Sequence, residues 1–187
     1  MMPALHFQRT GTGFPVILIH GYCETLEIWR DFVPLLSNHL DVTTLDLPGF
    51  GKSPALQQPF TVDEVADIVT DFIKSQHFTE KPLPIGHSLG GYVVLSMVAR
   101  YPDLFAGAGL FHSTAFADSE EKKANRNKAI EFVNRNGARP FIDSLIPNLF
   151  ADKSNNRVKT ALDIGYQTPD STITGYAAAM RDRPDRS

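Results

Sequence analysis

Apolar residues in the first part of the chain form short continuous runs rather than alternating with polar ones. The clearest run is Pro15–Ile19, and the segments 6–9, 41–45, 81–85 and 106–111 also indicate strands. A strand that is buried on both faces has this continuous pattern, which is typical of a parallel sheet covered by helices. Helical spacing over 25–36, 61–75 and 89–101 alternates with these strands. The pattern therefore predicts an α/β fold with a doubly wound, mostly parallel sheet.

Local signals support two of these elements and weaken a third. Thr61, followed three positions later by Glu64, forms a capping box at the start of the helix over 61–75. The helix over 89–101 stops before Pro102. The strand over 81–85 contains Pro82 and Pro84, which is unfavourable in a central strand because proline has no N–H to donate to a ladder.

From about residue 116 the pattern changes to consecutive helices without strands. Asp118 and Glu121 have capping-box spacing before a charged helix, and Gly137 is placed to end that helix. A shorter apolar segment over 140–149 follows, then helical patterns over 157–166 and from Thr168 onward. We expect two parts, an α/β core over residues 1–115 and a helical subdomain over residues 116–187.

Composition and charge argue against several classes of protein. The 187 residues are 42% hydrophobic and 21% charged, as in ordinary globular proteins, and the net charge of −3 gives no basic footprint for nucleic acid. No apolar run approaches the roughly 20 residues of a membrane span, and the N-terminus has no signal-peptide pattern. The single cysteine, Cys23, excludes an internal disulfide and suits a reducing cytoplasm, where we expect the protein to act. No His, Cys or carboxylate cluster has metal-ligand spacing, so neither a metal nor a cofactor is expected.

One motif stands out between an apolar strand and an apolar helix. Gly86, Ser88 and Gly90 form Gly-x-Ser-x-Gly, the strand–turn–helix pattern of a nucleophile elbow. Such a turn strains the serine backbone and exposes its hydroxyl, and it leaves no room for side chains two residues before and after it. Leu89 opens the helix, so its backbone N–H is expected to point toward an oxyanion formed at Ser88.

Three motifs together resemble the α/β-hydrolase superfamily, in that family's order. They are Ile19-His20-Gly21-Tyr22, Asp46-Leu47-Pro48-Gly49-Phe50-Gly51-Lys52-Ser53 and Gly86-His87-Ser88-Leu89-Gly90-Gly91. The resemblance implies that Ser88 is the nucleophile of a serine hydrolase acting on an ester or related acyl bond. It also implies that Tyr22 lends a second backbone N–H to the oxyanion hole. His20 is interpreted as a structural histidine that braces loops.

The resemblance further implies that the helical subdomain is a lid. Its apolar residues suggest a small apolar ester-like substrate, although core packing explains them equally well; they are Phe116, Phe141, Leu149, Phe150 and Met180. A phosphate-binding loop is the rejected alternative for residues 49–53. Asp46 stands where that motif needs its first glycine, and Pro54 argues against a following helix.

The expected triad is incomplete in this sequence. In this fold an acid and then a histidine follow the nucleophile, because serine needs a base to take its proton. After Ser88 the only histidine is His112, which is too early, and Asp103 is the only acid between them. The chain therefore resembles the N-terminal portion of a longer hydrolase. A truncated, non-catalytic chain that binds a ligand or partner is the alternative. Without further strands, the strand over 106–111 would be an exposed edge through which the chain could self-associate.

Overall fold

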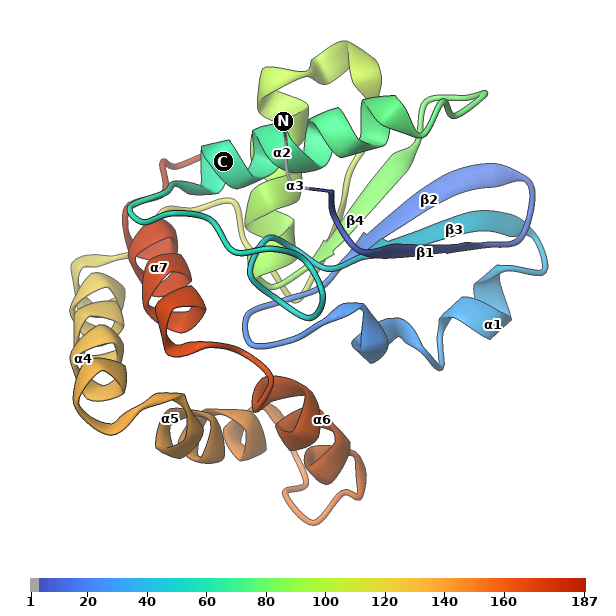
Figure 1. Ribbon diagram of the computed structural model, residues 1–187. Coiled ribbons are helices and arrows are strands. Elements are labelled where there is room, and N and C mark those ends of the chain that lie inside the picture. The colour runs from blue at the N-terminus through green and yellow to red at the C-terminus, as the bar shows by residue number, and fades with distance from the viewer. Residues whose placement is uncertain (1–3) are drawn as a thin grey trace.

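The computed structural model describes residues 4–187, so residues 1–3, which are part of the stretch examined for a signal peptide, lie outside it. Five strands form one sheet in the order β1-β3-β2-β4-β5 (Figure 1). Their bounds are Phe7–Thr10 for β1, Phe14–Ile19 for β2, Leu40–Leu45 for β3, Leu83–His87 for β4 and Gly109–Phe111 for β5. Only β1 runs antiparallel to its neighbour. The predicted mostly parallel sheet is confirmed.

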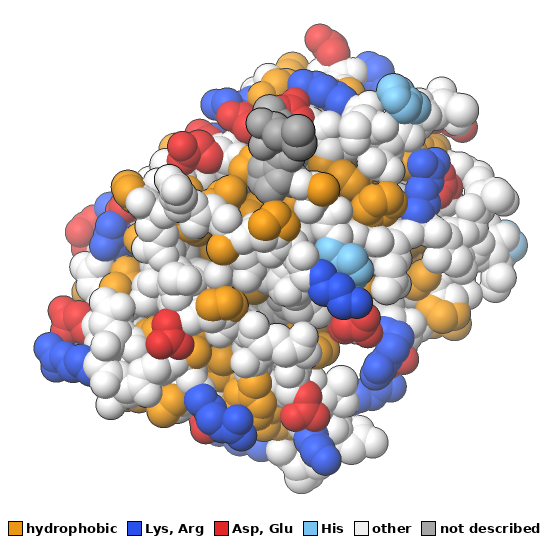
Figure 2. Space-filling model, in the orientation of Figure 1, with side chains coloured by type: hydrophobic (Ala, Val, Ile, Leu, Met, Phe, Trp, Pro, Cys, Tyr) orange, Lys and Arg blue, Asp and Glu red, His pale blue; other side chains and the backbone are white. Residues whose placement is uncertain are grey.

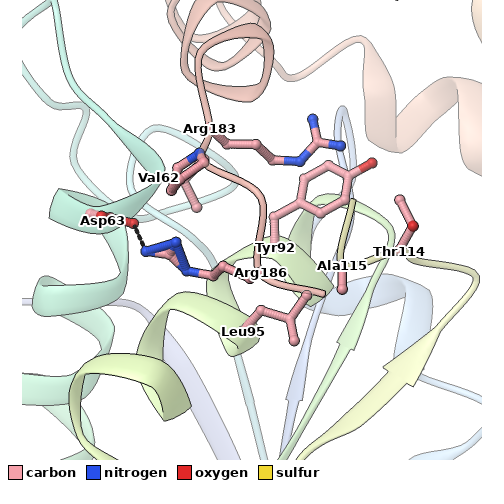
Figure 3. A pocket seen from close by; sticks show the side chains of 9 residues that line it. Val62, Asp63, Tyr92, Leu95, Thr114, Ala115, Arg183 and Arg186 are labelled. Carbon is pink, nitrogen blue, oxygen red and sulfur yellow. Dashed lines mark hydrogen bonds and ion pairs between the residues drawn. The ribbon is translucent and has the colours of Figure 1, made fainter. Parts of the chain in front are cut away.

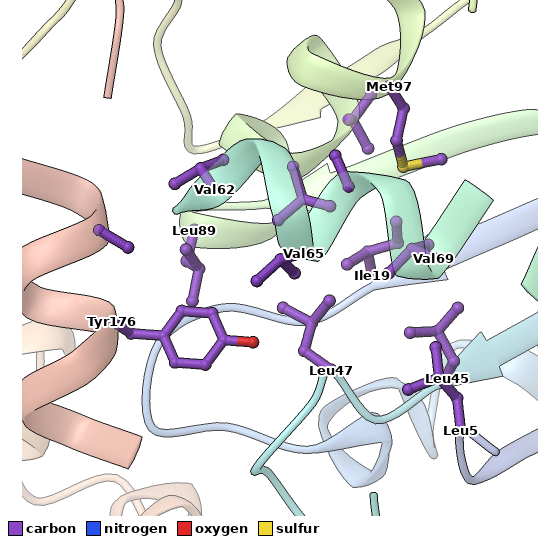
Figure 4. Packing of buried hydrophobic residues seen from close by; sticks show 14 of the residues in the cluster. Leu5, Ile19, Leu45, Leu47, Val62, Val65, Val69, Leu89, Met97 and Tyr176 are labelled. Carbon is purple, nitrogen blue, oxygen red and sulfur yellow. The ribbon is translucent and has the colours of Figure 1, made fainter. Parts of the chain in front are cut away.

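Both faces of the central strand β2 are buried, as its continuous apolar run predicts. Ile17 and Ile19 of β2 point into a large core with residues of helices α2 (Val62–Ser75) and α3 (Leu89–Arg100), part of which Figure 4 shows. Val16 and Leu18 point to the opposite face, where they pack with Trp29. Trp29 is thus a core residue. Burying both faces makes β2 a fixed central strand.

Helix α2 begins as its sequence signal predicts. The Thr61 side chain accepts from the backbone N–H of Glu64 at 3.1 Å, and the Glu64 carboxylate accepts from the backbone N–H of Thr61 at 2.7 Å. This reciprocal capping box satisfies two N–H groups that have no partner within the helix. Helix α3 ends at Arg100, and a 3-10 turn over Pro102–Leu104 follows.

The single helix predicted over residues 25–36 is wrong. The structure has a 3-10 turn, η1, over Leu26–Trp29 and a separate short helix, α1, over Val33–Leu36. Pro34 lies in the first turn of α1, where a missing N–H costs nothing. In one continuous helix, its ring would clash with a carbonyl one turn earlier. The chain therefore breaks before Val33.

The strand around Pro84 tolerates proline because its pairing is one-sided at that point. Pro84 is opposite Ile17 of β2, whereas the ladder to β5 begins one residue later, at Ile85 opposite Gly109. Strand β5 is also shorter than the predicted strand over 106–111. It lies at the edge of the sheet, and Leu110 and Phe111 are each 43% exposed.

The rest of the chain is helical and lies to one side of the sheet in Figure 1. Its elements are α4 (Glu120–Asn136), α5 (Ala138–Leu145), the 3-10 turn η3 (Ile146–Leu149), α6 (Arg157–Gly165) and α7 (Asp170–Arg181). Gly137 follows α4 with a φ of 80°, as a residue that ends a helix often does. The predicted cap, Asp118, is wrong: the side chain of Ser119 accepts from the N–H of Lys122. Asp118 is buried and engaged by arginines instead.

Helix α7 is anchored to the loop that follows β3. The Tyr176 hydroxyl donates to the carbonyl of Pro48 at 2.9 Å, and the Thr172 hydroxyl donates to the carbonyl of Gly49 at 3.1 Å. The Tyr176 ring also packs against Phe50 and belongs to the core shared with α2 and α3 (Figure 4). The division into a core over 1–115 and a subdomain over 116–187 stays a prediction. Among the helices of residues 4–187, none combines the length and apolar character needed to cross a membrane.

Candidate active site

Ser88 lies at the junction between β4 and α3, in a strained conformation. Its φ of 49° and ψ of −113° are rarely adopted by residues other than glycine. Two hydrogen bonds hold it there. The Ser88 N–H donates to the carbonyl of Phe111 at 3.0 Å, and the Ser113 hydroxyl donates to the carbonyl of Ser88 at 2.8 Å. The sheet therefore fixes the sharp turn.

The glycines on either side of Ser88 are required by close backbone approach. A Cβ added to Gly86 would lie 2.2 Å from the carbonyl carbon of Gly90. A Cβ added to Gly90 would lie 2.5 Å from the carbonyl oxygen of Ile19. Both separations are far below a carbon–carbon or carbon–oxygen contact distance, so the strand and helix can meet here only through glycine.

The backbone N–H groups of Tyr22 and Leu89, near Ser88, have no acceptor within residues 4–187. Leu89 is the first residue of α3, where N–H groups have no partner within the helix. The Tyr22 side chain is occupied separately, since its hydroxyl donates to the carbonyl of Ile173 at 2.7 Å. Any role for Tyr22 in binding an oxyanion thus falls to its backbone.

His20 is fully buried and hydrogen-bonded at both ring nitrogens. Its Nε2 accepts from the N–H of Leu47 at 2.9 Å, and its Nδ1 lies 2.8 Å from the carbonyl of Gly21. These partners assign the proton to Nδ1. Burial lowers the pKa of His20, which keeps the imidazole neutral. His20 therefore connects two loops, as its structural interpretation predicts.

The sequence reasoning missed Glu24. Its Oε2 accepts from the backbone N–H of Gly21 at 2.6 Å and lies 2.8 Å from Nδ1 of His87. One carboxylate thus joins the loop that carries Tyr22 to the residue before Ser88. The only sequence signal was an acid three positions after a glycine, which is too common to single out.

The loop over residues 46–54 is a structured turn, not a phosphate cradle. The Asp46 carboxylate accepts from the N–H groups of Leu26 at 2.8 Å and Lys52 at 3.0 Å, and it lies 2.8 Å from Nδ1 of His6. Its negative charge occupies the space inside the turn. A phosphate would be repelled there.

A cavity of about 760 Å³ opens at Ser88. Its floor includes His87, Ser88 and His112, and its wall on the helical side is mainly apolar. The apolar residues of that wall are Leu145, Ile146, Leu149, Phe150, Ala161, Ile164 and Met180. Of the apolar residues singled out from the sequence, Leu149, Phe150 and Met180 line the cavity. Phe141 packs against Tyr22 instead, and Phe116 is 64% exposed on the surface.

Within residues 4–187, no hydrogen bond joins the Ser88 hydroxyl to a histidine. His87 is bound to Glu24, and His112 lines the cavity with the centre of its ring 6.3 Å from that of His87. The same residues hold no group of His, Cys, Asp and Glu side chains that could bind a metal ion. The described part of the chain thus provides a strained serine and free N–H groups, without an assembled base.

The fold and the elbow define the class, and the comparison with protein families agrees. Residues 15–180 match the family model described as alpha/beta hydrolase fold, and the chain belongs to this family.

Individual relatives are hydrolases that are longer than this chain. An esterase structure from Thermogutta terrifontis, solved with malate bound, is 31% identical with a TM-score of 0.88, and the match covers 98% of this chain and 69% of that one. The 2-hydroxy-6-oxo-6-(2'-aminophenyl)hexa-2,4-dienoic acid hydrolase of Metapseudomonas resinovorans is 35% identical over 52% of this chain and 35% of its own length. The pimeloyl-[acyl-carrier protein] methyl ester esterase of Sodalis glossinidius is 36% identical over 57% of this chain and 39% of its own length. The matches to these two curated relatives thus span little more than a third of their length.

Proposed function

We propose that this chain carries the nucleophile and oxyanion hole of a serine hydrolase that cleaves an ester or related acyl bond. Ser88 attacks the acyl carbon, and the N–H groups of Tyr22 and Leu89 stabilise the resulting oxyanion. The observation that carries the proposal is the elbow geometry: a strained Ser88 at the floor of a cavity, next to two N–H groups without acceptors in residues 4–187. The esterase relatives support the ester class of substrate.

The helical segment over residues 116–187 is proposed to be the lid of this site. Its support is the apolar wall that η3, α6 and α7 contribute to the cavity. A small ester with an apolar portion fits such a wall, because burial of apolar surface favours binding. The cytoplasm remains the proposed compartment, supported by the single buried cysteine, Cys23.

The acid and base of the triad are proposed to come from residues outside this chain of 187. This follows from the Ser88 hydroxyl, which has no histidine partner in the described residues, and from relatives that are longer than the chain. The competing function is binding without turnover. The observation in its favour is the same missing base, since an unactivated serine is a weak nucleophile.

The test is hydrolysis of p-nitrophenyl acetate by the chain and by Ser88→Ala, each with and without added imidazole as a soluble base. We expect hydrolysis above the Ser88→Ala background that imidazole increases, and an acetyl group on Ser88 detected by peptide mass spectrometry. Equal rates for both proteins, with no acetylated Ser88, would reject the serine-nucleophile proposal and favour binding without turnover.

A further inference from the structure

Among residues 4–187, Arg126 is the one arginine in the interior of the cavity that contains Ser88. It lies on α4 and lines the cavity together with Tyr22 and Met180. Its side chain is 26% exposed, and its Nε donates to Oδ2 of Asp118 at 3.2 Å. No other carboxylate in the described part of the chain lies within ion-pair distance of it. Since a guanidinium has five N–H donors, most of those of Arg126 have no carboxylate of these residues to bind.

Asp118 does not fully neutralise the charge of Arg126, because the same carboxylate also pairs with Arg183. Oδ1 of Asp118 lies 2.8 Å from Nη1 of Arg183, and both side chains are at most 4% exposed. Arg183 also donates to the carbonyls of Met180 and Phe116, and its guanidinium lies 3.8 Å from the centre of the Tyr92 ring (Figure 3). One carboxylate thus faces two guanidinium groups. A net positive charge remains on the cavity side, at Arg126.

The other charged groups of the cavity do not offset this charge. At the rim, Asp31 pairs with both Arg30 and Arg157, and all three side chains are at least half exposed. The carboxylate of Glu27 also lines the cavity at an exposed position, so two positive and two negative charges balance at the rim. On the face shown in Figure 2, positive and negative side chains are likewise interspersed. Inside the cavity, the Glu24 carboxylate is engaged by Gly21 and His87. Burial raises the pKa of the Tyr22 phenol, and the charge of Arg126 acts in the opposite direction, so Arg126 lies close enough to act on a neighbouring side chain of the cavity.

We propose that Arg126 is a binding site for a carboxylate carried by the substrate, so that the cavity takes half-esters of short dicarboxylic acids. The acid end binds the guanidinium, which matches the geometry of a carboxylate. The methylene chain follows the apolar wall, and the ester end reaches Ser88. The placement of the ester end at Ser88 rests on the proposed function, whereas the carboxylate site at Arg126 does not.

Binding can be measured without turnover in the full chain carrying Ser88→Ala. The probes are the monomethyl esters of succinic, adipic and suberic acids, each paired with its dimethyl ester, titrated by calorimetry. We expect at least one monoester to bind about tenfold or more tightly than its uncharged dimethyl partner, as a hydrogen-bonded charge pair provides. The chain length with the strongest preference reports the distance between the two subsites.

Three further variants locate the effect. Arg126→Gln should abolish the preference for the monoester over the dimethyl ester, and Arg126→Lys should retain part of it. Arg157→Gln, at the exposed rim, is the matched control and should retain all of it. Thermal unfolding verifies that each variant is folded. A preference that survives Arg126→Gln, a preference lost in Arg157→Gln, or no monoester binding at all would each overturn the proposal. Because Ser88 is already absent, none of these outcomes bears on whether Ser88 is a nucleophile.

Discussion

The Nδ1 atom of His87 lies 2.8 Å from Oε2 of Glu24, and that same oxygen accepts the backbone N–H of Gly21 at 2.6 Å. The first contact ends at the residue before Ser88, and the second ends at the residue before Tyr22. Glu24 therefore sets the separation between the two backbone segments that would form the oxyanion hole. It is a positioning residue, since it acts through its neighbours.

Replacing Glu24 should separate its role as an acceptor from its role as a charge. Glu24→Ala leaves the buried N–H of Gly21 without an acceptor and should cost about 1–3 kcal/mol in free energy of unfolding, whereas Glu24→Gln keeps an oxygen there and should cost less. Denaturant unfolding measures the cost, and amide hydrogen exchange at Gly21 should accelerate only in the alanine variant. Equal exchange rates in the two variants would contradict this role.

The strain at Ser88 should be measurable as stability. Ser88→Gly and Ser88→Ala both remove the hydroxyl, but only glycine accepts a φ of 49° without strain. Relief of strain of about 1–3 kcal/mol exceeds the added flexibility of the unfolded glycine chain. We expect the glycine variant to unfold at higher denaturant concentration than the alanine variant. The reverse order would show that the conformation is not strained.

His20 should make stability fall in mild acid. Burial lowers its pKa below the ordinary value of 6.5, so the unfolded chain takes up a proton more readily than the folded one. The stability linked to neutral His20 is fully present above pH 6.5, and it is lost as the pH falls from there toward the pKa of His20 in the folded chain. In His20→Gln, the decrease in unfolding free energy between neutral pH and mild acid should be smaller than in the parent chain. The exposed His39→Gln is the matched control and should leave the decrease unchanged.

Removing the charge of Asp118 should be strongly destabilising. Asp118→Asn leaves the buried guanidinium of Arg183 without its counter-charge, and breaking such a pair costs about 3–5 kcal/mol. The exposed Asp152→Asn should cost far less. Urea unfolding of both variants tests this, and similar costs would mean that solvent screens the Arg183 charge.

The free edge of the sheet should promote self-association. Strand β5 has no neighbour on one side within residues 4–187, and Leu110 and Phe111 are each 43% exposed there. Sedimentation velocity should show larger species at higher concentration, and Leu110→Lys should suppress them because a charge on an edge strand opposes pairing. Leu35→Lys, at an exposed residue of α1, should not. A monomer at all concentrations would refute the prediction.

The sequence predicted those features that depend on neighbours along the chain. The continuous apolar run at Pro15–Ile19 indicated a parallel sheet, Thr61 with Glu64 marked the start of α2, and the glycines around Ser88 marked the elbow. Pro34 explains the break within residues 25–36. A proline is tolerated in the first turn of a helix but not inside one, and the spacing of apolar residues did not show which of these positions Pro34 occupies.

Features that depend on residues distant in sequence could not be predicted. Asp118 has the pattern of a helix cap, yet Arg183, from the far end of the helical segment, pairs with it. Glu24 gains its importance only where the ends of β2 and β4 meet. The surplus charge of Arg126 likewise follows from how two arginines share one acid, and neither is near the other in sequence.

The anchoring of α7 determines which wall of the cavity is compliant. Tyr176 and Thr172 bond this helix to the backbone at Pro48 and Gly49, in the loop after β3, and Tyr176 packs in the core, so the α7 side of the cavity is held to the core. In the described residues, α5 has no hydrogen bond to residues 4–115, and α6 has one, from Arg157 at its start to the exposed Asp31. A ligand too bulky for the resting opening would therefore enter by displacing α5 and α6. The width of that entrance would depend on how far the wall formed by Leu145, Leu149 and Ile164 can be displaced.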